Sequence, residues 1–153
     1  MEKFITKNEK ETKKLAKILA NEILKQKKVY SEQLVVSLVE SSRGAAVIGL
    51  EGNLGAGKTT FIQAFAKGMG IRKRLTSPTF VLMKKYNNLY HLDCYRIKDS
   101  QDVLALDFKE IISEPKNIIL IEWAEKIKRI LPKDKIWIKF KILGKTQRII
   151  TFS

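Results

Sequence analysis

Cysteine is almost absent from this sequence, because Cys94 is the only one in 153 residues. A single cysteine cannot form a disulfide within the chain or assemble a metal site from several thiolates, which is typical of a reducing compartment. Long apolar runs are absent too, since none approaches the about 20 residues that a membrane-spanning helix needs. The opening segment, MEKFITKNEKETKK, lacks the apolar core of a signal peptide. We therefore expect a cytoplasmic protein with no membrane partner.

Acidic residues are scarce relative to basic ones. The chain has 16 Asp and Glu against 30 Lys and Arg, for a formal net charge of +14. Such a surface favours an anionic partner, such as tRNA, DNA or an acidic protein face. The lysines are spread along the chain, however, and the tightest basic cluster is the short run Arg72-Lys73-Arg74. Two interpretations stay open: contact with tRNA through a basic surface, or a lysine-rich composition without a specific partner.

Length and composition predict one domain over residues 1–153. The stretch Thr6-Lys7-Asn8-Glu9 matches a capping box and predicts the start of a helix, and a second amphipathic stretch at residues 34–39 predicts another. The other expected elements are, in chain order, a buried strand at 45–50, a helix at 58–69, strands at 80–86 and 89–97, a helical region at 100–113, a buried strand at 118–121, a short helix at 124–130, and a terminal hairpin of strands at 136–142 and 148–152.

The run GLEGNLGAGKTTF, residues 49–61, carries the pattern of a phosphate-binding loop. Gly52 is followed by four residues and then by Gly57, Lys58 and Thr59, which matches G-x-x-x-x-G-K-[ST]. Glycines let the backbone approach an anion closely and adopt positive φ angles. The strand expected before the run and the helix expected after it are the context in which this pattern binds a nucleotide. A chance glycine-rich turn is the alternative, and the Lys-Thr pair at this offset argues against it.

The loop predicts specific contacts with a bound nucleotide. Backbone N–H groups of residues 54–59 should surround the β-phosphate, with Lys58 bridging the β- and γ-phosphates and the Thr59 hydroxyl ligating Mg²⁺. A second Mg²⁺ ligand usually comes from a carboxylate at the end of a neighbouring buried strand, where Glu122 stands, although a surface Glu is the alternative. Guanine-binding proteins of this class usually carry Asn-Lys-x-Asp. The sequence lacks that tetrapeptide, so ATP is the expected nucleotide.

A polar segment, LTSPTFVLMKKYNNLYHLDCYRI, separates the loop from Glu122. In P-loop enzymes this region senses the γ-phosphate and positions water. Spacing of two residues puts His91, Asp93 and Tyr95 on one side of an expected strand. Asp93 could hold the attacking water or a water bound to Mg²⁺. His91 could contact a phosphate or a partner, or have a structural role, and Arg96 could supply charge or form an ordinary ion pair.

Four stretches together resemble the TsaE (YjeE) family: GLEGNLGAGKTTF, TSPTF, YHLDCYR and IEW. Their order and spacing match over nearly the whole chain, and TSPTF with H-x-D-x-Y-R is far more specific than the loop alone. The resemblance implies an α/β P-loop NTPase fold, in which helices flank a central mixed, mostly parallel sheet with a C-terminal β-hairpin. It also implies a small bacterial ATPase that works with TsaB and TsaD in threonylcarbamoyladenosine modification of tRNA and resets that complex.

Carried over residue by residue, the resemblance implies a set of site residues. The residues expected to bind ATP are Leu54, Gly55, Ala56, Gly57, Lys58, Thr59 and Thr60 at the phosphates, with Thr12 and Lys145 on the adenine side. Those expected to bind Mg²⁺ are Thr59 and Glu122, and those expected to act in catalysis are Lys58, Asp93 and Glu122. Glu9 and Arg148 are further candidates beside the adenine.

The sequence departs from the family at two places that bear on the site. Asn53 stands where the family usually has Asp, which removes a charge near the phosphates and leaves the backbone cradle intact. Residues 25–42 exceed the family's usual link between the first helix and the first strand. The extra helix expected there could alter the adenine pocket or add a partner surface.

Two other functions remain as alternatives. A small-molecule kinase of this size needs an acceptor pocket and usually an arginine-rich lid, and Lys126, Lys128 and Arg129 are the nearest feature after Glu122. A basic nucleic-acid-binding module that uses ATP as a switch should bind RNA with a steep dependence on salt. Hydrolysis of ATP without any acceptor would argue against the first, and weak salt dependence against the second.

Overall fold

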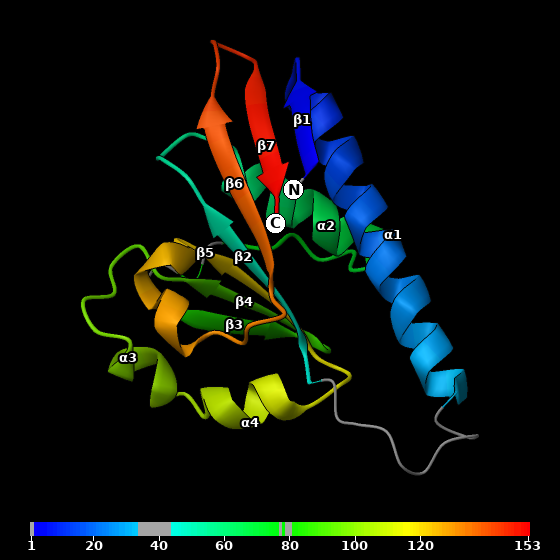
Figure 1. Cartoon of the computed structure of the whole chain (residues 1–153), viewed down its shortest axis with the longest axis vertical. Helices are drawn as coiled ribbons and strands as arrows, with labels where there is room; N and C mark the ends of the chain where they lie inside the picture. Colours follow the sequence, from blue (N-terminus) through cyan, green and yellow to red (C-terminus); the bar gives the residue numbers. More distant parts are fainter. Residues whose placement is uncertain (1, 34–43, 77, 79–80) are drawn as a thin grey trace.

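The computed structural model describes residues 2–33, 44–76, 78 and 81–153. The strands are β1 (Glu2–Thr6), β2 (Ala46–Glu51), β3 (Met83–Tyr86), β4 (Leu89–Asp93), β5 (Ile118–Glu122), β6 (Ile136–Ile142) and β7 (Arg148–Phe152). The helices are α1 (Glu9–Gln33), α2 (Lys58–Gly68), α3 (Gln101–Leu104), α4 (Phe108–Ser113) and the 3₁₀ helix η1 (Ala124–Ile130). All the strands belong to one seven-stranded sheet in the order β1-β7-β6-β2-β5-β4-β3 (Figure 1).

The four central strands, β6, β2, β5 and β4, are parallel to one another, and the three outer strands are antiparallel to their neighbours. The α/β architecture, the mixed sheet and the C-terminal hairpin of β6 and β7 are confirmed. Register brings the ends of the central strands together, because Glu122 pairs with Leu50 on one side and with Asp93 on the other. Ligands of open α/β sheets bind outside this carboxyl edge.

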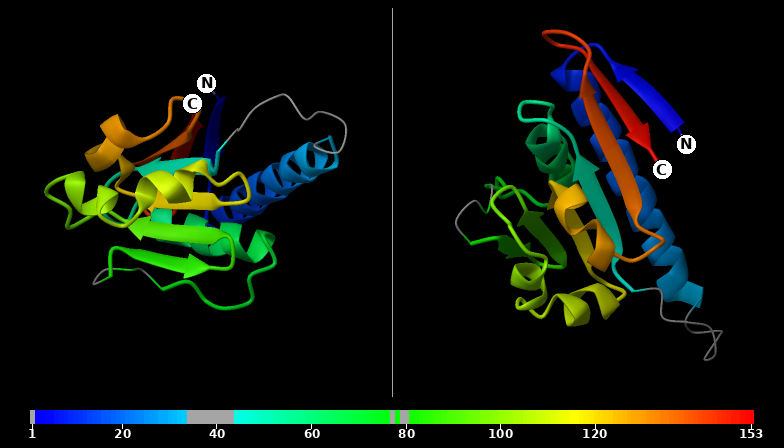
Figure 2. Two further views of the ribbon diagram at one scale, coloured as in Figure 1. Left: turned by 90° about the horizontal axis from the view of Figure 1, so that it is seen from below. Right: turned by 60° about the vertical axis from the view of Figure 1, so that its left-hand side comes forward.

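Helices cover both faces of the sheet (Figure 2). One core joins α1 and α2 to the sheet, and a second lies between the sheet and η1, α3 and α4. Every residue of β5 is buried, as expected for a strand with helices on both faces. Helices α1 and α2 touch closely at Gly68, where an added Cβ would lie 2.9 Å from the Ala20 Cβ. This contact fixes the far end of α2, and with it the direction in which its first residue faces the site.

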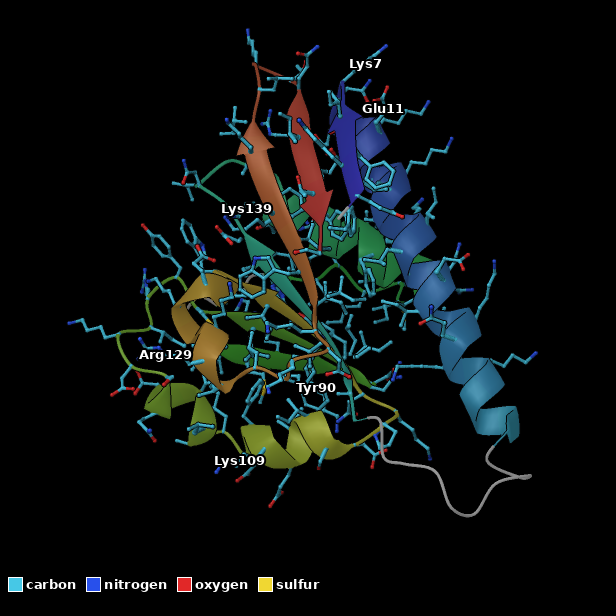
Figure 3. All side chains as sticks on the ribbon, viewed as in Figure 1. Lys7, Glu11, Tyr90, Lys109, Arg129 and Lys139 are labelled. Atoms are coloured by element: carbon cyan, nitrogen blue, oxygen red, sulfur yellow. The ribbon has the colours of Figure 1, made fainter. Side chains whose placement is uncertain are left out.

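The N-terminal region differs from the prediction. Residues 2–6 form a strand, β1, that pairs with β7, and this strand was not predicted. Thr6 therefore ends a strand and does not cap α1. Asn8 is the cap: its side chain accepts a hydrogen bond from the Glu11 N–H at 3.0 Å, while Glu11 accepts one from the Lys7 N–H at 2.8 Å. Figure 3 shows Lys7 and Glu11 together where α1 begins.

Other boundaries shifted by smaller amounts. Strand β4 ends at Asp93, earlier than the expected residue 97. The helical region expected at 100–113 is present as the two short helices α3 and α4. Residues 25–33 continue α1 without a break, so the extra segment begins as an extension of the first helix. The second helix expected over residues 34–39 lies outside the described residues. Within the described parts of the chain, no helix is both long enough and apolar enough to cross a membrane.

Candidate functional site

The phosphate loop leaves β2 and enters α2 through backbone that favours glycine. Gly55 has a φ of 75° and Gly57 a φ of 101°, and an added Cβ at either would meet nothing within 4 Å. The glycines are therefore needed for their left-handed backbone, which L side chains rarely adopt. Within the described parts of the chain, no side chain caps the start of α2. Its first amide groups thus face the loop without an internal partner, which is the arrangement that binds anions. The Ala56 N–H is already used, because it donates to the Asn53 carbonyl at 3.1 Å.

Lys58, the first residue of α2, folds back across the loop. Its side chain is buried, with only 4% exposed. The ammonium donates hydrogen bonds to the carbonyl oxygens of Gly52 and Asn53, and it lies 4.0 Å from the centre of the Trp123 ring. Burial lowers the pKa of Lys58, and the carboxylates of Glu122, Glu125 and Asp93 oppose that effect. The loop thus holds a poorly solvated cation beside the uncapped start of α2.

Thr59 and Glu122 connect the loop to the sheet. The Thr59 hydroxyl donates to Glu122 Oε2 at 2.9 Å, so α2 is joined to the carboxyl end of β5. Glu122 is buried at 4% exposure. Its second oxygen, Oε1, lies 3.1 Å from Nε2 of His91, which is fully buried in β4. Three residues far apart in the sequence therefore form one hydrogen-bonded chain from helix to sheet.

Asp93 stands beside this chain. Register pairs it with Glu122, and its Oδ1 accepts a hydrogen bond from the Tyr95 N–H at 3.0 Å. Tyr95 and Trp123 form a tilted aromatic pair with ring centres 5.2 Å apart. Trp123 has a left-handed backbone with a φ of 57°, which turns the chain sharply after β5 and sets the ring against Lys58. Arg96 is exposed, and Ser77 and Thr79 lie outside the described residues.

These groups line an open pocket of about 370 Å³. Its walls consist of the predicted phosphate-loop residues together with the acidic and aromatic residues from the ends of β4 and β5: Leu54, Gly55, Ala56, Gly57, Lys58, Thr59, Thr60, Asp93, Tyr95, Glu122 and Trp123. The structure therefore brings together every residue predicted for the phosphate and metal side. It does not bring Thr12 or Lys145 to this pocket.

Thr12 and Lys145, two of the four residues predicted for the adenine side, lie outside this pocket. Thr12 is 3% exposed, and its hydroxyl lies 2.9 Å from the Thr6 hydroxyl in a buried pair that links α1 to β1. Lys145 is exposed in the turn between β6 and β7. Their assignment to the adenine stays a prediction, and Thr12 already has a structural partner.

Arg148, a further candidate for the adenine side, makes contacts with the phosphate loop that the sequence analysis did not predict. From the start of β7, its guanidinium donates to the carbonyls of Gly55 and Ala56 at 3.1 and 3.2 Å. It also donates to the carbonyls of Gly144 and Gln147 in the hairpin turn. One side chain thus joins the phosphate loop to the hairpin. The sequence gives no stronger indication of these contacts than a single Arg at the start of the last strand.

The donor groups of the pocket suit a magnesium-bound nucleotide. Lys58 and the amides at the start of α2 could hold phosphate oxygens. Thr59 and Glu122 could hold Mg²⁺, because that ion prefers oxygen ligands and is usually bound by one or two carboxylates together with substrate phosphates. The hydrogen bond between Thr59 and Glu122 shows that both groups already face a common point.

Comparison with known proteins agrees with this geometry. The sequence model of the family described as "Threonylcarbamoyl adenosine biosynthesis protein TsaE" matches residues 6–150. A relative from Bacillus subtilis, named tRNA threonylcarbamoyladenosine biosynthesis protein TsaE, is 37% identical over 155 residues, covering 99% of this chain and 84% of the relative. A relative of the same name from Rickettsia felis is 35% identical over 151 residues, covering 95% of this chain and 76% of its own.

A solved structure matches as well. The crystal structure of Bacillus subtilis YdiB superposes with a TM-score of 0.70 at 35% sequence identity, covering 99% of this chain and 83% of that one. Fold and sequence agree over nearly the full length of this chain. This chain therefore belongs to the TsaE family of P-loop NTPases.

Proposed function

We propose that this protein hydrolyses ATP to ADP and phosphate, and that it does so as an accessory protein in threonylcarbamoyladenosine modification of tRNA together with TsaB and TsaD. The single observation that carries the ATPase proposal is the 2.9 Å hydrogen bond between Thr59 and Glu122. It joins the residue after the loop lysine to an acidic residue at the end of the adjacent parallel strand, as magnesium-dependent nucleotide hydrolysis requires. The pathway is supported by the names of the two relatives.

Each residue of the pocket has a role in this proposal. Lys58 leaves the Gly52 and Asn53 carbonyls and donates to oxygens of the β- and γ-phosphates. That exchange is favourable because a lysine bonds more strongly to a charged phosphate than to a neutral carbonyl. Thr59 and Glu122 would hold Mg²⁺, and the bound ion would supply positive charge to offset the negative charge of the phosphates. The uncapped amides of α2 orient the triphosphate in the same direction.

Asp93 is proposed to position the attacking water. It lies beside Glu122 and lines the same pocket. The hydrogen bond from the Tyr95 N–H to Oδ1 fixes the rotation of the carboxylate. A fixed carboxylate can accept a hydrogen bond from a water and so orient it for attack on the γ-phosphorus, in line with the departing ADP. The positioning by Asp93 is thus built into the turn that follows β4.

Partners are proposed to accelerate the reaction. Among the described residues that line the pocket, Lys58 is the only cation. The nearby Arg148 guanidinium donates its hydrogen bonds to backbone carbonyls. A cationic side chain supplied in trans at such a site can raise kcat by roughly 10³- to 10⁵-fold. We therefore expect slow hydrolysis by the protein alone and faster hydrolysis with TsaB and TsaD.

The test is steady-state ATP hydrolysis without any phosphate acceptor, measured alone and with TsaB and TsaD. The Asp93→Asn variant should keep affinity for an ATP analogue within about threefold and lose about 100-fold or more in kcat. Asp134→Asn, an exposed change in the turn before β6, is the matched control and should hydrolyse like the wild type. Equal turnover by Asp93→Asn would remove that residue from the mechanism.

Pathway membership needs its own experiment. Reconstituted tRNA modification should proceed through repeated cycles with this protein present and stop early without it. Turnover that appears only when an acceptor is added would favour a kinase instead. Direct tRNA binding that weakens by about 10³-fold between low and moderate salt, without TsaB or TsaD, would favour a nucleic-acid-binding switch.

A further inference from the structure

His91, the one histidine of the sequence, is buried in an unusual way. It lies in the middle of β4, paired with Lys84 of β3 and Leu120 of β5, and is 0% exposed. Buried polar atoms nearly always have hydrogen-bond partners. Nε2 has one, in Glu122 Oε1, whereas Nδ1 is buried and has none among the described residues. An apolar side chain would avoid that unpaired nitrogen, so its presence at this position requires a reason.

The pattern of partners defines which nitrogen carries the hydrogen. An ionised carboxylate only accepts hydrogen bonds, so Nε2 must be the donor to Glu122. A hydrogen on Nδ1 would be a buried donor without an acceptor among the described residues, which is costly. The hydrogen that the geometry requires is therefore the one on Nε2, and His91 acts as a directed hydrogen-bond donor to Glu122.

This hydrogen bond determines how Glu122 faces the pocket. The two oxygens of the carboxylate have separate partners. Oε1 accepts a hydrogen bond from Nε2 of His91, and Oε2 accepts one from the Thr59 hydroxyl. With Oε1 held at the sheet, Oε2 must point toward α2 and the pocket. Without the donor, Oε1 would be a buried acceptor with no partner, and the carboxylate could turn away from Thr59. The strands alone do not fix this rotation, because Glu122 is the last residue of β5.

We propose that His91 is a positioning residue, which fixes the Glu122 carboxylate so that Thr59 and Glu122 together present a preformed oxygen pair to Mg²⁺. The inference rests on the proposed function, and it adds a residue to which the sequence had assigned no definite role. Residues that hydrogen-bond to metal ligands commonly change metal affinity by 10- to 100-fold when removed. His91 should act in this way although it lies too deep in the sheet to line the pocket.

Two variants at this position separate positioning from packing. His91→Gln keeps an N–H donor at the end of a side chain long enough to reach Glu122. His91→Asn carries the same amide group on a shorter chain, so its donor corresponds to the Nδ1 position and falls short of Oε1. Both amides are polar and buried, and they differ in reach. The readout is the affinity for N-methylanthraniloyl-ADP, with Mg²⁺ and with EDTA, beside the unfolding temperature of the ligand-free protein.

Wild type should bind the probe more tightly with Mg²⁺ than with EDTA. The gain is the ratio of the affinity with Mg²⁺ to the affinity with EDTA. In His91→Asn we expect this ratio to fall about tenfold while the affinity in EDTA stays unchanged. His91→Gln should retain most of the gain. A structural role would lower the unfolding temperature and change both affinities together. If both variants keep the wild-type gain, or lose affinity equally in EDTA, the proposal is wrong. If the wild type shows no gain from Mg²⁺, the proposed function itself fails.

A measurement on the wild type protects the test against variants that do not fold. Nitrogen-15 NMR of a tag-free, histidine-labelled protein observes only His91, because no other histidine is present. We expect a hydrogen on Nε2 throughout, because that nitrogen faces Glu122. A ring that carries its hydrogen on Nδ1 alone, or a mixture of the two neutral forms that exchanges as in a free imidazole, would overturn the proposal without any substitution.

Discussion

The phosphate side of the site and the predicted adenine side are built in opposite ways. On the phosphate side, buried polar groups from the central parallel strands and from α2 bond to one another and line one pocket. On the adenine side, Thr12 is used in a buried pair with Thr6, and Lys145 projects from an exposed turn. In one region the polar groups surround an open pocket. The other consists of outer strands and a helix start whose polar groups hold the fold.

Arg148 is the link between the two regions. It lies in an outer strand, yet two of its hydrogen bonds end on the phosphate loop. The shape of the loop therefore depends on the hairpin of β6 and β7 as well as on its own glycines. The comparison indicates that phosphate affinity should depend strongly on a few residues, while adenine preference should depend weakly on many.

The largest effect should come from Lys58. Replacement by Met keeps the apolar stem and removes the cation that two carbonyls and the Trp123 ring now hold. Hydrogen bonds to charged groups contribute about 1.5–3 kcal/mol each, so losing two should weaken binding of an ATP analogue at least about 100-fold in calorimetry. Lys67→Met, an exposed change on the same helix, is the control. Wild-type affinity in Lys58→Met would place the nucleotide elsewhere.

An intermediate effect is expected for Arg148. The Arg148→Ala change should weaken ATP and inorganic tripolyphosphate alike, by about tenfold, because the loop loses its tie to the hairpin. Arg148→Lys should restore only part of the loss, since an ammonium cannot reproduce the planar fork of donors. Lys145→Ala sharpens the comparison. If the turn contacts adenine, that variant should weaken ATP and leave tripolyphosphate unchanged in the same competition assay.

The smallest effect on binding should come from Thr12. The Thr12→Val change removes the hydroxyl that pairs with Thr6 and should lower the free energy of unfolding by about 1 kcal/mol, measured by urea titration. Affinity for ATP should stay within about twofold, and Thr12→Ser should behave like the wild type. A selective loss of ATP affinity, with tripolyphosphate affinity unaffected, would indicate that Thr12 contributes to adenine binding. The proposed difference between the two regions would then be wrong.

The phosphate side could be predicted from the sequence because its geometry is local. Glycine spacing fixes the loop, and Lys58 and Thr59 follow it directly in the chain. Glu122 was predictable from one further rule, that parallel buried strands end at the same edge of a sheet. The tie from His91 to Glu122 was not, although the spacing of His91 and Asp93 put both on one face. It depends on the register of β4 against β5, which pairs His91 with Leu120.

The outer elements were harder to predict because nothing local distinguishes their alternatives. Both Thr6-x-x-Glu9 and Asn8-x-x-Glu11 fit a helix-capping pattern. The pairing of Thr6 with Arg148, at the other end of the described chain, decides between them by placing Thr6 in a strand. The five residues of β1 alternate too weakly between apolar and polar side chains to predict a strand, and most of them are exposed.

Pairing of the first strand with the last one has a consequence for how the protein is made. During translation, β1 cannot pair with its neighbour until β7 has left the ribosome, because β7 is the one strand that pairs with β1 among the described residues. Arg148 arrives with β7, so the nascent phosphate loop lacks its clamp over the same interval. Contacts between such distant segments form late and slowly. A growing chain should therefore reach its full affinity for nucleotide only after β7 has emerged and paired with β1 and β6.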